Sequence, residues 1–275
     1  MSPVPQTVFG IEGVGLFGQG MGGVSPARPG LSPNIWFDAP LMAMVIDPGL
    51  GIYVKDDLTW VGATGLPYEL IGTNGTMTPV ASSPYGEMLI NCPAVDNNEA
   101  HVTWGNDVTG LIKCSADKAW WFEARIKMNQ IVAEYGVLVG LLQQGASADD
   151  ILADNTMIFT ATLDYIGFQI VEAAANPAPN WRTIMQLAAR AAVSETAAPA
   201  SVSYVKLGMK SVPNAAGTLA TIYFFVDGVQ LATSTTSADT NFPLDQVLIP
   251  HWSAKTGSGA AVSMTVDWWA GAQLR

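Results

Sequence analysis

The sequence predicts an all-β protein: two packed antiparallel sheets preceded by an extended N-terminal arm. Three observations lead to this prediction. Apolar and polar residues alternate with a period of two in several segments after residue 50, long helical patterns are missing from the same region, and glycine and proline gather before residue 50. We therefore expect an arm over residues 1–50 and a β-sandwich over residues 51–275.

The alternation is clearest in residues 121–128, where every second residue from Phe122 to Met128 is apolar. This pattern predicts a strand with one buried face. The other face should carry three charged side chains into solvent: Glu123, Arg125 and Lys127. Residues 262–269 alternate in the same way, which places Trp268 on the apolar face and Trp269 on the opposite one.

Continuous apolar runs at residues 135–142, 165–171 and 222–226 are typical of strands that are buried on both faces. Two short turn signals separate β-type segments. Asp227-Gly228 and Asn74-Gly75 each stand between such segments and predict β-hairpins.

The first 50 residues differ from the rest of the chain in composition. They contain 9 Gly and 7 Pro, whereas the other 225 residues contain 18 Gly and 10 Pro. Their only charged residues are Glu12, Arg28, Asp38 and Asp47. Because glycine and proline at this density do not sustain a helix, we expect an irregular, extended arm. Its apolar anchors are expected to dock on a partner: Phe9, Phe17, Trp36 and Phe37.

Composition excludes several classes of protein. Twelve Lys and Arg against twenty-three Asp and Glu give a net charge of −11, which argues against nucleic acid as a partner. A hydrophobic fraction of 49% argues against disorder, and no apolar run approaches the ~18 residues that span a membrane. The first residues do not resemble a secretory signal, so we expect a chain made in a reducing cytoplasm. Cys92 and Cys114 are then buried free thiols, with a Cys92–Cys114 bridge as the alternative.

The motifs that carry cofactor or metal chemistry are weak. Residues 13–18 match G-x-G-x-x-G, and Asp38 follows, but the glycine-rich residues 19–26 do not form the helix that a dinucleotide site needs. His101 and His251 are the only histidines and lack metal-ligand spacing. We expect His251 to be a satisfied structural histidine, and we expect neither a cofactor nor a metal.

Catalytic carboxylates are not apparent either. Sandwich glycosidases present paired acids along one strand, whereas the acids on the strands expected here are isolated: Glu123, Glu172, Asp227 and Asp267. The adjacent pairs Asp56-Asp57 and Asp149-Asp150 are expected to be solvated turn residues. The sequence therefore predicts no enzymatic activity. A glycosidase whose acids come from different strands stays as a third alternative.

Nine tryptophans include the adjacent pairs Trp120-Trp121 and Trp268-Trp269. On a strand, one member of each pair faces outward. We expect Trp121 and Trp269 to be outward, where they could stack on a sugar ring or fill a protein interface. The scarcity of charged residues, 13% of the chain, favours the interface.

Three stretches carry a resemblance to a known family: 121–127 (WFEARIK), 222–229 (IYFFVDGV), and 249–257 (IPHWSAKTG) leading into 266–269 (VDWW). Their succession resembles the concanavalin A-like (laminin G-like) jelly rolls encoded among the structural genes of tailed bacteriophages. The resemblance covers residues 50–275 and implies a jelly-roll sandwich with a capsid decoration or cement role. Lectin and glycosidase relatives use calcium ligands or paired acids that this sequence does not show.

These observations lead to an expected function. We expect a non-enzymatic virion protein on the capsid exterior that contacts the major capsid protein as a homo-oligomer, a trimer or dimer, with the arm along neighbouring subunits. A net charge of −11 suits a position outside the packaged DNA. The alternative is a lectin-like module of the virion that binds host-surface glycans through exposed tryptophan.

Overall fold

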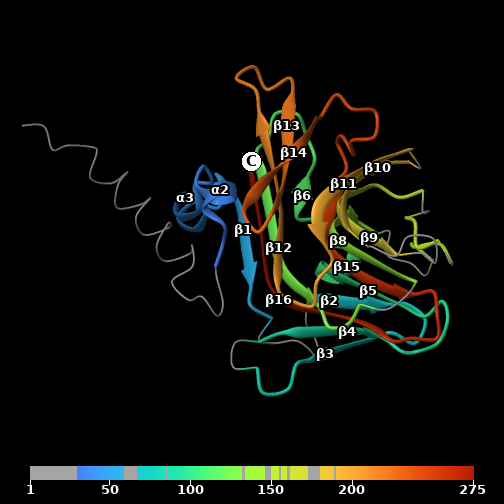
Figure 1. Ribbon diagram of the computed structural model, residues 1–275. Coiled ribbons are helices and arrows are strands. Elements are labelled where there is room, and N and C mark those ends of the chain that lie inside the picture. Colours follow the sequence, from blue (N-terminus) through green and yellow to red (C-terminus); the bar gives the residue numbers. More distant parts are fainter. Residues whose placement is uncertain are drawn as a thin grey trace, which may run out of the picture.

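The protein folds as two antiparallel sheets packed face to face, which confirms the predicted all-β sandwich (Figure 1). The structure is a computed structural model that describes residues 30–58, 67–83, 86–131, 134–145, 150–154, 156–159, 162–172, 180–188 and 190–275. The helices among these residues are α2 (Pro33–Trp36), α3 (Leu41–Ile46) and the 3₁₀ turn η1 (Gly105–Asp107). In this part of the chain, no helix has the length and apolar character needed to cross a membrane.

The first sheet has the order β14-β13-β12-β7-β16-β4-β3, and β1 pairs with the C-terminal half of β16. The long strand β16 therefore contacts β7 along one side and β4 and then β1 along the other. The strands are β1 (Gly51–Asp56), β3 (Thr76–Pro79), β4 (Met88–Cys92), β7 (Trp120–Met128), β12 (Val205–Pro213), β13 (Ala220–Val226), β14 (Val229–Thr236) and β16 (Val262–Leu274).

The second sheet has the order β11-β10-β9-β8-β15-β5-β2, and β6 pairs with the start of β15. The predicted apolar runs form β8, β9 and β13, and β8 is buried on both faces as expected. The strands of this sheet are β2 (Tyr68–Ile71), β5 (Glu99–Trp104), β6 (Ile112–Lys113), β8 (Tyr135–Gln143), β9 (Tyr165–Glu172), β10 (Asn180–Leu187), β11 (Arg190–Pro199) and β15 (Val247–Thr256).

Aromatic side chains from both sheets fill the space between them. Phe168 of β9 meets Phe224 of β13 edge to face, with 5.8 Å between the ring centroids. Trp252 of β15 packs against Trp269 of β16 at 5.9 Å. Cys92 and Cys114 are buried free thiols, as predicted, and the alternative bridge between them does not form.

A β-bulge in β16 overturns the predicted orientation of one tryptophan pair. The pairing of β16 with β7 shifts register between Val266 and Trp268, so that Trp269 lies opposite the core residue Ala124. Because side chains alternate along a strand, one inserted residue exchanges the two faces. Trp269 therefore lies in the core, where its indole nitrogen donates to the Tyr68 hydroxyl at 2.7 Å, and Trp268 faces outward.

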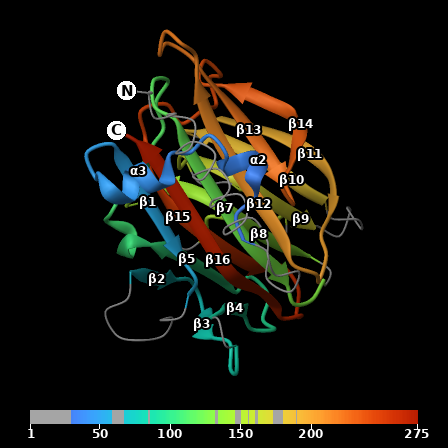
Figure 2. The ribbon, with the colours of Figure 1, turned by 90° about the vertical axis from the view of Figure 1, so that its left-hand side faces the viewer.

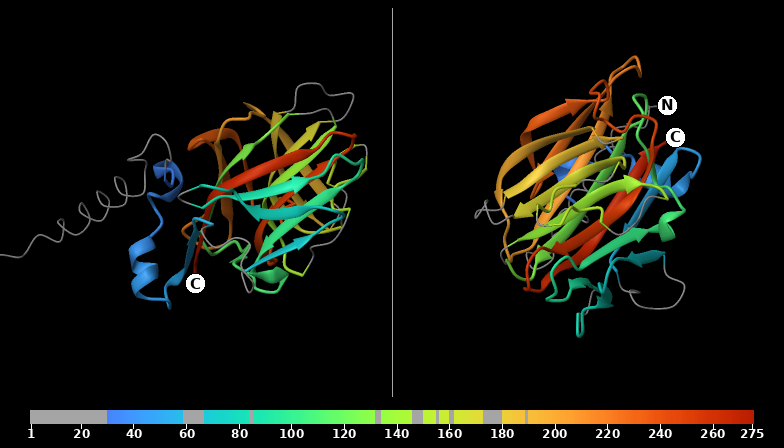
Figure 3. Two further views of the ribbon diagram at one scale, coloured as in Figure 1. Left: turned by 90° about the horizontal axis from the view of Figure 1, so that it is seen from below. Right: turned by 90° about the vertical axis from the view of Figure 1, so that its right-hand side faces the viewer.

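The described part of the arm packs on the outer face of the first sheet (Figures 2 and 3). The expectation of a helix-free segment is wrong for residues 33–36 and 41–46, which form α2 and α3. Two short helical turns tolerate the prolines, since Pro33 occupies the first position of α2. The segment and the sheet share an apolar cluster: Leu31, Ile35, Trp36, Leu41, Met44, Trp121, Phe225, Trp268, Ala270 and Ala272.

Charged residues under this segment are buried, contrary to the expected solvated face of β7. Glu123 is fully buried, and its Oε2 accepts hydrogen bonds from the Ser32 backbone N–H at 2.9 Å and the Trp36 indole at 2.8 Å. Lys210 of β12 donates to Asp38 at 3.0 Å. Arg125, also buried, pairs with Asp267 beside the bulge. These polar contacts fix where residues 30–46 sit on the sheet.

The two turn signals have different outcomes. Asp227-Gly228 joins β13 to β14 as a hairpin, and both residues have positive φ, as a type I′ turn requires. The hairpin expected at Asn74-Gly75 is wrong, because β2 and β3 belong to different sheets. Asn74 instead forms an isolated bridge with Glu99 as the chain crosses between the sheets.

Replacement of Glu123 by glutamine should make the protein more stable at pH 7.5. Burial is the largest influence on the pKa of Glu123 and raises it, despite the opposing hydrogen bonds from Ser32 and Trp36. A raised pKa means that the folded state holds this proton more tightly than the unfolded state, so wild-type stability falls as the pH rises above the ordinary value of 4.5. Glu123→Gln keeps an accepting oxygen without the charge.

Urea unfolding followed by tryptophan fluorescence, at pH 4.5 and pH 7.5, measures this effect. The advantage of Glu123→Gln over wild type should be larger at pH 7.5 than at pH 4.5. Glu123→Ala should instead cost about 1–3 kcal/mol at both values, since it leaves two buried donors unpaired. An advantage that does not depend on pH would contradict the role given to the buried charge.

Candidate functional site

The outer face of the second sheet carries a row of polar side chains on the neighbouring strands β5 and β15. The register places three pairs opposite one another: Thr103 and His251, His101 and Ser253, and Glu99 and Lys255. All six are buried. A buried polar row on the outside of a sandwich is unusual enough to be a candidate site, because buried polar groups need partners.

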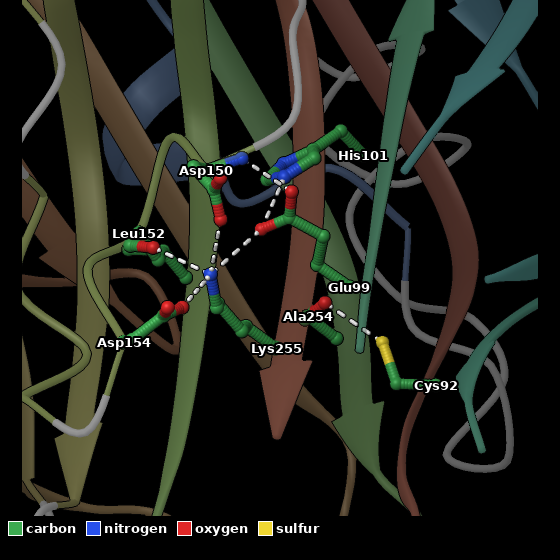
Figure 4. A network of polar contacts seen from close by, with 8 residues as sticks. All are labelled: Cys92, Glu99, His101, Asp150, Leu152, Asp154, Ala254 and Lys255. Carbon is green, nitrogen blue, oxygen red and sulfur yellow. Dashed lines mark hydrogen bonds and ion pairs between the residues drawn. The ribbon is translucent and has the colours of Figure 1, made fainter. Parts of the chain in front are cut away.

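Lys255 is the centre of this site (Figure 4). Its Nζ lies 3.2 Å from Glu99 Oε2, 2.9 Å from Asp150 Oδ1 and 2.7 Å from Asp154 Oδ1, and it donates to the Leu152 carbonyl at 2.9 Å. The Lys255 and Glu99 side chains are buried, whereas those of Asp150 and Asp154 are 76% and 50% exposed. A strand residue thus holds the start of the β8–β9 connection against the sheet.

The charges in this network stabilise one another. Burial lowers the pKa of Lys255, but hydrogen bonds to Asp154 and Asp150 and the charge of Glu99 raise it above the ordinary lysine value. Burial raises the pKa of Glu99, but contacts with His101, the Asp150 backbone N–H and Lys255 bring it below the ordinary value. Both groups therefore stay charged near neutral pH. A general acid or base needs a pKa near the working pH. The raised pKa of Lys255 and the lowered pKa of Glu99 both lie further from neutral pH than usual, so this pair is poorly suited to proton transfer.

The two histidines stack beside the network. The His101 and His251 rings are 5.7 Å apart and nearly parallel, and His101 Nε2 lies 3.1 Å from Glu99 Oε2. Burial and then the neighbouring His101 hold the pKa of His251 well below its ordinary value, so its ring is neutral. The expectation of a satisfied His251 is wrong, since neither ring nitrogen has a hydrogen-bond partner among the described residues. Within the same residues, His, Cys, Asp and Glu form no group of three that could hold a metal.

The described residues of the β8–β9 connection pack directly on this face. A side chain at Gly136 of β8 would lie 2.9 Å from Leu152 and Met157, so glycine makes room for both. The connection and the sheet share a second apolar cluster: Leu138, Leu142, Ile151, Leu152, Phe159, Tyr165 and Ile184. The polar row is therefore a closed, internal site rather than an open cleft.

An open groove of about 620 Å³ lies elsewhere, between β1, β6 and the C-terminal end of β16. Its floor is rigid, because the Gln273 side chain accepts from the Lys113 N–H at 2.8 Å and donates to the Lys113 carbonyl at 2.6 Å. Its lining combines aliphatic and polar groups: Ile52, Gly110, Leu111, Lys113, Ser115, Asp117, Lys118, Asp245, Gln273, Leu274 and Arg275.

The charged side chains of the groove are only loosely paired. Lys113 Nζ lies 3.4 Å from Asp245, and Lys118 Nζ lies 3.6 Å from Asp117, with all four side chains substantially exposed. Exposed ion pairs of this kind contribute little to stability. The neighbouring Ser115 hydroxyl is the main reason that the pKa of Asp117 is lowered. The groove therefore offers ionised acceptors and donors that can exchange partners with a ligand.

The expected partner-binding residues do not form one site. Trp36 and Trp121 are buried where the arm segment meets the first sheet of the same chain, and Trp269 is in the core. Phe37 is 72% exposed at the end of α2. Phe9 and Phe17 lie outside the described residues. Trp121 and Trp269 are therefore not exposed to a sugar ring in the way that the sequence suggested.

Sequence reasoning missed the Lys255 network. Asp150 belongs to the Asp149-Asp150 pair that was expected to be solvated, and Lys255 stands in a strand of mixed polarity. Glu99, Asp150 and Lys255 are far apart along the chain, and only the pairing of β5 with β15 joins two of them. The one available signal was the period of two that puts Lys255, Ser253 and His251 on a single face.

Comparisons with known proteins agree on the fold. No protein-family model matches the chain, and no curated protein matches it. A protein of unknown function from Shewanella oneidensis MR-1 aligns with a TM-score of 0.51 at 14% identity, over 90% of this chain and 96% of that one. Peanut lectin aligns with a TM-score of 0.53 at 10% identity, over 82% and 98%. An endo-1,3-beta-glucanase from Streptomyces sioyaensis aligns with 0.51 at 12%, over 83% and 98%.

The chain therefore has a lectin-like jelly-roll fold, as the resemblance implied. The fold is shared by lectins and by glycoside hydrolases, so it does not decide between binding and catalysis. These similarities support the concanavalin A-like part of the resemblance and do not bear on its bacteriophage part.

Replacement of Lys255 by methionine should destabilise the protein by about 3–5 kcal/mol, because it leaves the Glu99 carboxylate buried without its cation. Urea unfolding at pH 7.5 measures the change. Lys118→Met, at an exposed ion pair, is the matched control and should change stability by less than about 0.5 kcal/mol. The double variant Lys255→Met/Glu99→Leu should recover part of the loss. Equal stability of the two single variants would contradict the role given to Lys255.

Proposed function

We propose that the protein is a non-enzymatic, lectin-like module that binds carbohydrate in the groove beside Gln273. The observation that carries this proposal is the groove itself, about 620 Å³ in volume and lined by carboxylates, ammonium groups, a hydroxyl and aliphatic side chains. Sugar hydroxyls both donate and accept hydrogen bonds, so they need acceptors and donors together. The lectin-like fold supports the same reading.

The groove is a better candidate than the outer face of the second sheet. Small-molecule sites are concave, largely pre-formed and accessible. The Gln273–Lys113 hydrogen bonds pre-form the groove floor, and Asp117 and Asp245 stand exposed at its walls. The Lys255 network has its own chain packed over it.

The absence of catalysis is part of the proposal. A glycoside hydrolase needs two carboxyl groups on either side of the bond, one of them with a raised pKa. In the Lys255 network, Glu99, Asp150 and Asp154 converge on one ammonium group, and the pKa of Glu99 is lowered. In the groove, the pKa of Asp117 is lowered as well. Glu99 and Asp117 therefore lack the raised pKa that protonating a leaving group requires.

A panel of immobilised glycans, probed with the purified full-length chain with and without calcium, tests carbohydrate binding. We expect reproducible binding to a subset of glycans and no release of reducing sugar from the same glycans in solution. Asp117→Asn/Asp245→Asn should weaken that binding at least about tenfold, because charged hydrogen bonds are worth about 1.5–3 kcal/mol.

Asp96→Asn, an exposed acid in the turn between β4 and β5, is the matched control and should bind like wild type. A chain that binds none of the glycans would contradict the carbohydrate proposal. If Asp117→Asn/Asp245→Asn and Asp96→Asn bind the glycans equally well, the carbohydrate site does not lie in the groove. Release of reducing sugar would contradict the non-enzymatic part.

A second candidate function is that of a virion structural protein on the capsid exterior, in contact with the major capsid protein. Its support is the exposed apolar surface of the arm segment, where Phe37, Val45 and Ile46 are 72%, 62% and 75% exposed. Contiguous exposed apolar patches are typical of surfaces that contact another protein. A charged fraction of only 13% is also low for a chain whose whole surface meets water.

Purified particles test this second candidate. Mass spectrometry of density-gradient-purified phage should find the chain in the band that holds the major capsid protein, and antibody labelling should place it on the head. A chain found only in the soluble fraction of the lysate would contradict a virion role and leave the carbohydrate proposal unaffected.

A further inference from the structure

The arm segment has two apolar faces, of which one packs against the other described residues of the chain. The inner face packs on the first sheet through Leu41 and Met44. The opposite side of the same helix, with the residues that flank it, forms what we name the outer apolar face: Phe37, Met42, Val45, Ile46 and Leu50. These side chains are 72%, 46%, 62%, 75% and 38% exposed, respectively.

This face differs from the rest of the described surface. Sixteen large apolar side chains are exposed among the described residues, and five of them lie within residues 37–50. The others are spread over the remaining strands and loops. Met42, Val45 and Ile46 are three and four positions apart on α3, so they share one side of it. Scattered apolar residues are normal on a protein surface, whereas a cluster of this kind marks an interaction site.

The chemistry of the face suits a second copy of the same chain. Residues 39–46 carry no charged group, and of the two acids that flank them, Asp38 pairs with Lys210 and Asp47 accepts from the Gly49 N–H. Two copies of the face can therefore meet with few charges to desolvate. A two-fold axis brings the same surface of both copies together, and such pairs are the commonest oligomers. The polar contacts of Glu123, Lys210 and Asp38 already fix the segment on its sheet, so pairing would not have to order it.

The area of the outer apolar face determines how tightly two copies of the chain are expected to bind. Five partly exposed side chains of this size present about 400 Å² of apolar surface, and a two-fold pair would bury about 800 Å² in total. Stable interfaces bury about 1,200–2,000 Å², so a contact of this size belongs to the weak, concentration-dependent class. Two chains that each carry a net charge of −11 also repel each other, and salt screens that repulsion.

We propose that the outer apolar face is the contact between two copies of this chain, related by a two-fold axis. The proposal goes beyond carbohydrate binding and does not depend on it. It assigns the face to self-association, in preference to a membrane or a basic protein. Anionic membranes would be repelled by the net charge, and a basic partner would bind more weakly as salt is added.

Sedimentation equilibrium of the full-length chain tests the proposal over about 5–200 μM and at two salt concentrations. We expect the mass to rise with concentration from one chain toward two, and to rise further at the higher salt. Val45→Asp/Ile46→Asp should keep the mass of a single chain throughout. Both residues are mostly exposed, so these substitutions should leave the fold intact, and circular dichroism and tryptophan fluorescence check this.

Val95→Asp/Val108→Asp is the matched control, since these valines are 57% and 70% exposed and lie outside the arm segment. The control should associate like wild type. A wild-type chain that stays single over the whole range would overturn the proposal. So would a pair that survives Val45→Asp/Ile46→Asp, a pair that weakens with salt, or a closed trimer. A chain that forms pairs but binds no glycan would contradict the proposed carbohydrate binding and leave the proposed self-association unaffected.

Discussion

The bulge at residue 267 in β16 decides how the two sides of the first sheet are used. It turns Trp269 into the core, against Trp252 and Tyr68, and turns Trp268 outward. A regular strand would do the reverse, with Trp268 in the core and Trp269 outward. The buried pair of Arg125 and Asp267 sits at the irregular position, where the inserted residue leaves the ladder. One extra residue therefore decides which of the two adjacent indoles enters each packing layer.

The outward Trp268 makes the arm segment a third layer. Together with Trp121 and Phe225 it forms the apolar surface on which α2 and α3 pack. When the arm segment packs on the sheet, the Glu123 carboxyl group is buried away from solvent. Its hydrogen bonds from Ser32 and Trp36 replace its hydration only in part. Among the described residues, the segment buries one face against the sheet and leaves the other exposed.

Local patterns predicted the strands and the sandwich correctly, because alternation depends on neighbours two residues apart. The face of Trp269 could not be predicted in this way, since a bulge breaks the period and carries no side-chain signal of its own in residues 262–269. The burial of Glu123 was missed for a related reason: β7 alone does not reveal that residues 30–46 return to cover it. The burial of Arg125 depends on Asp267 of β16 and on Tyr204, which are also distant in sequence. The Lys255 network depends on β5, β15 and the β8–β9 connection together, so no single stretch contains it.

The two proposed surfaces lie next to each other, which connects recognition with self-association. Leu50 belongs to the outer apolar face, and its carbonyl accepts a hydrogen bond from the backbone of Arg275, which lines the groove. Pairing through the face would therefore hold two grooves near one axis. A shallow groove with loosely paired charges binds a single sugar weakly, but two linked grooves raise the effective concentration at a multivalent surface. A lectin-like fold with a modest site and a weak, apolar self-contact would then be a consistent arrangement, because binding to a repetitive surface would strengthen the proposed pairing of two chains.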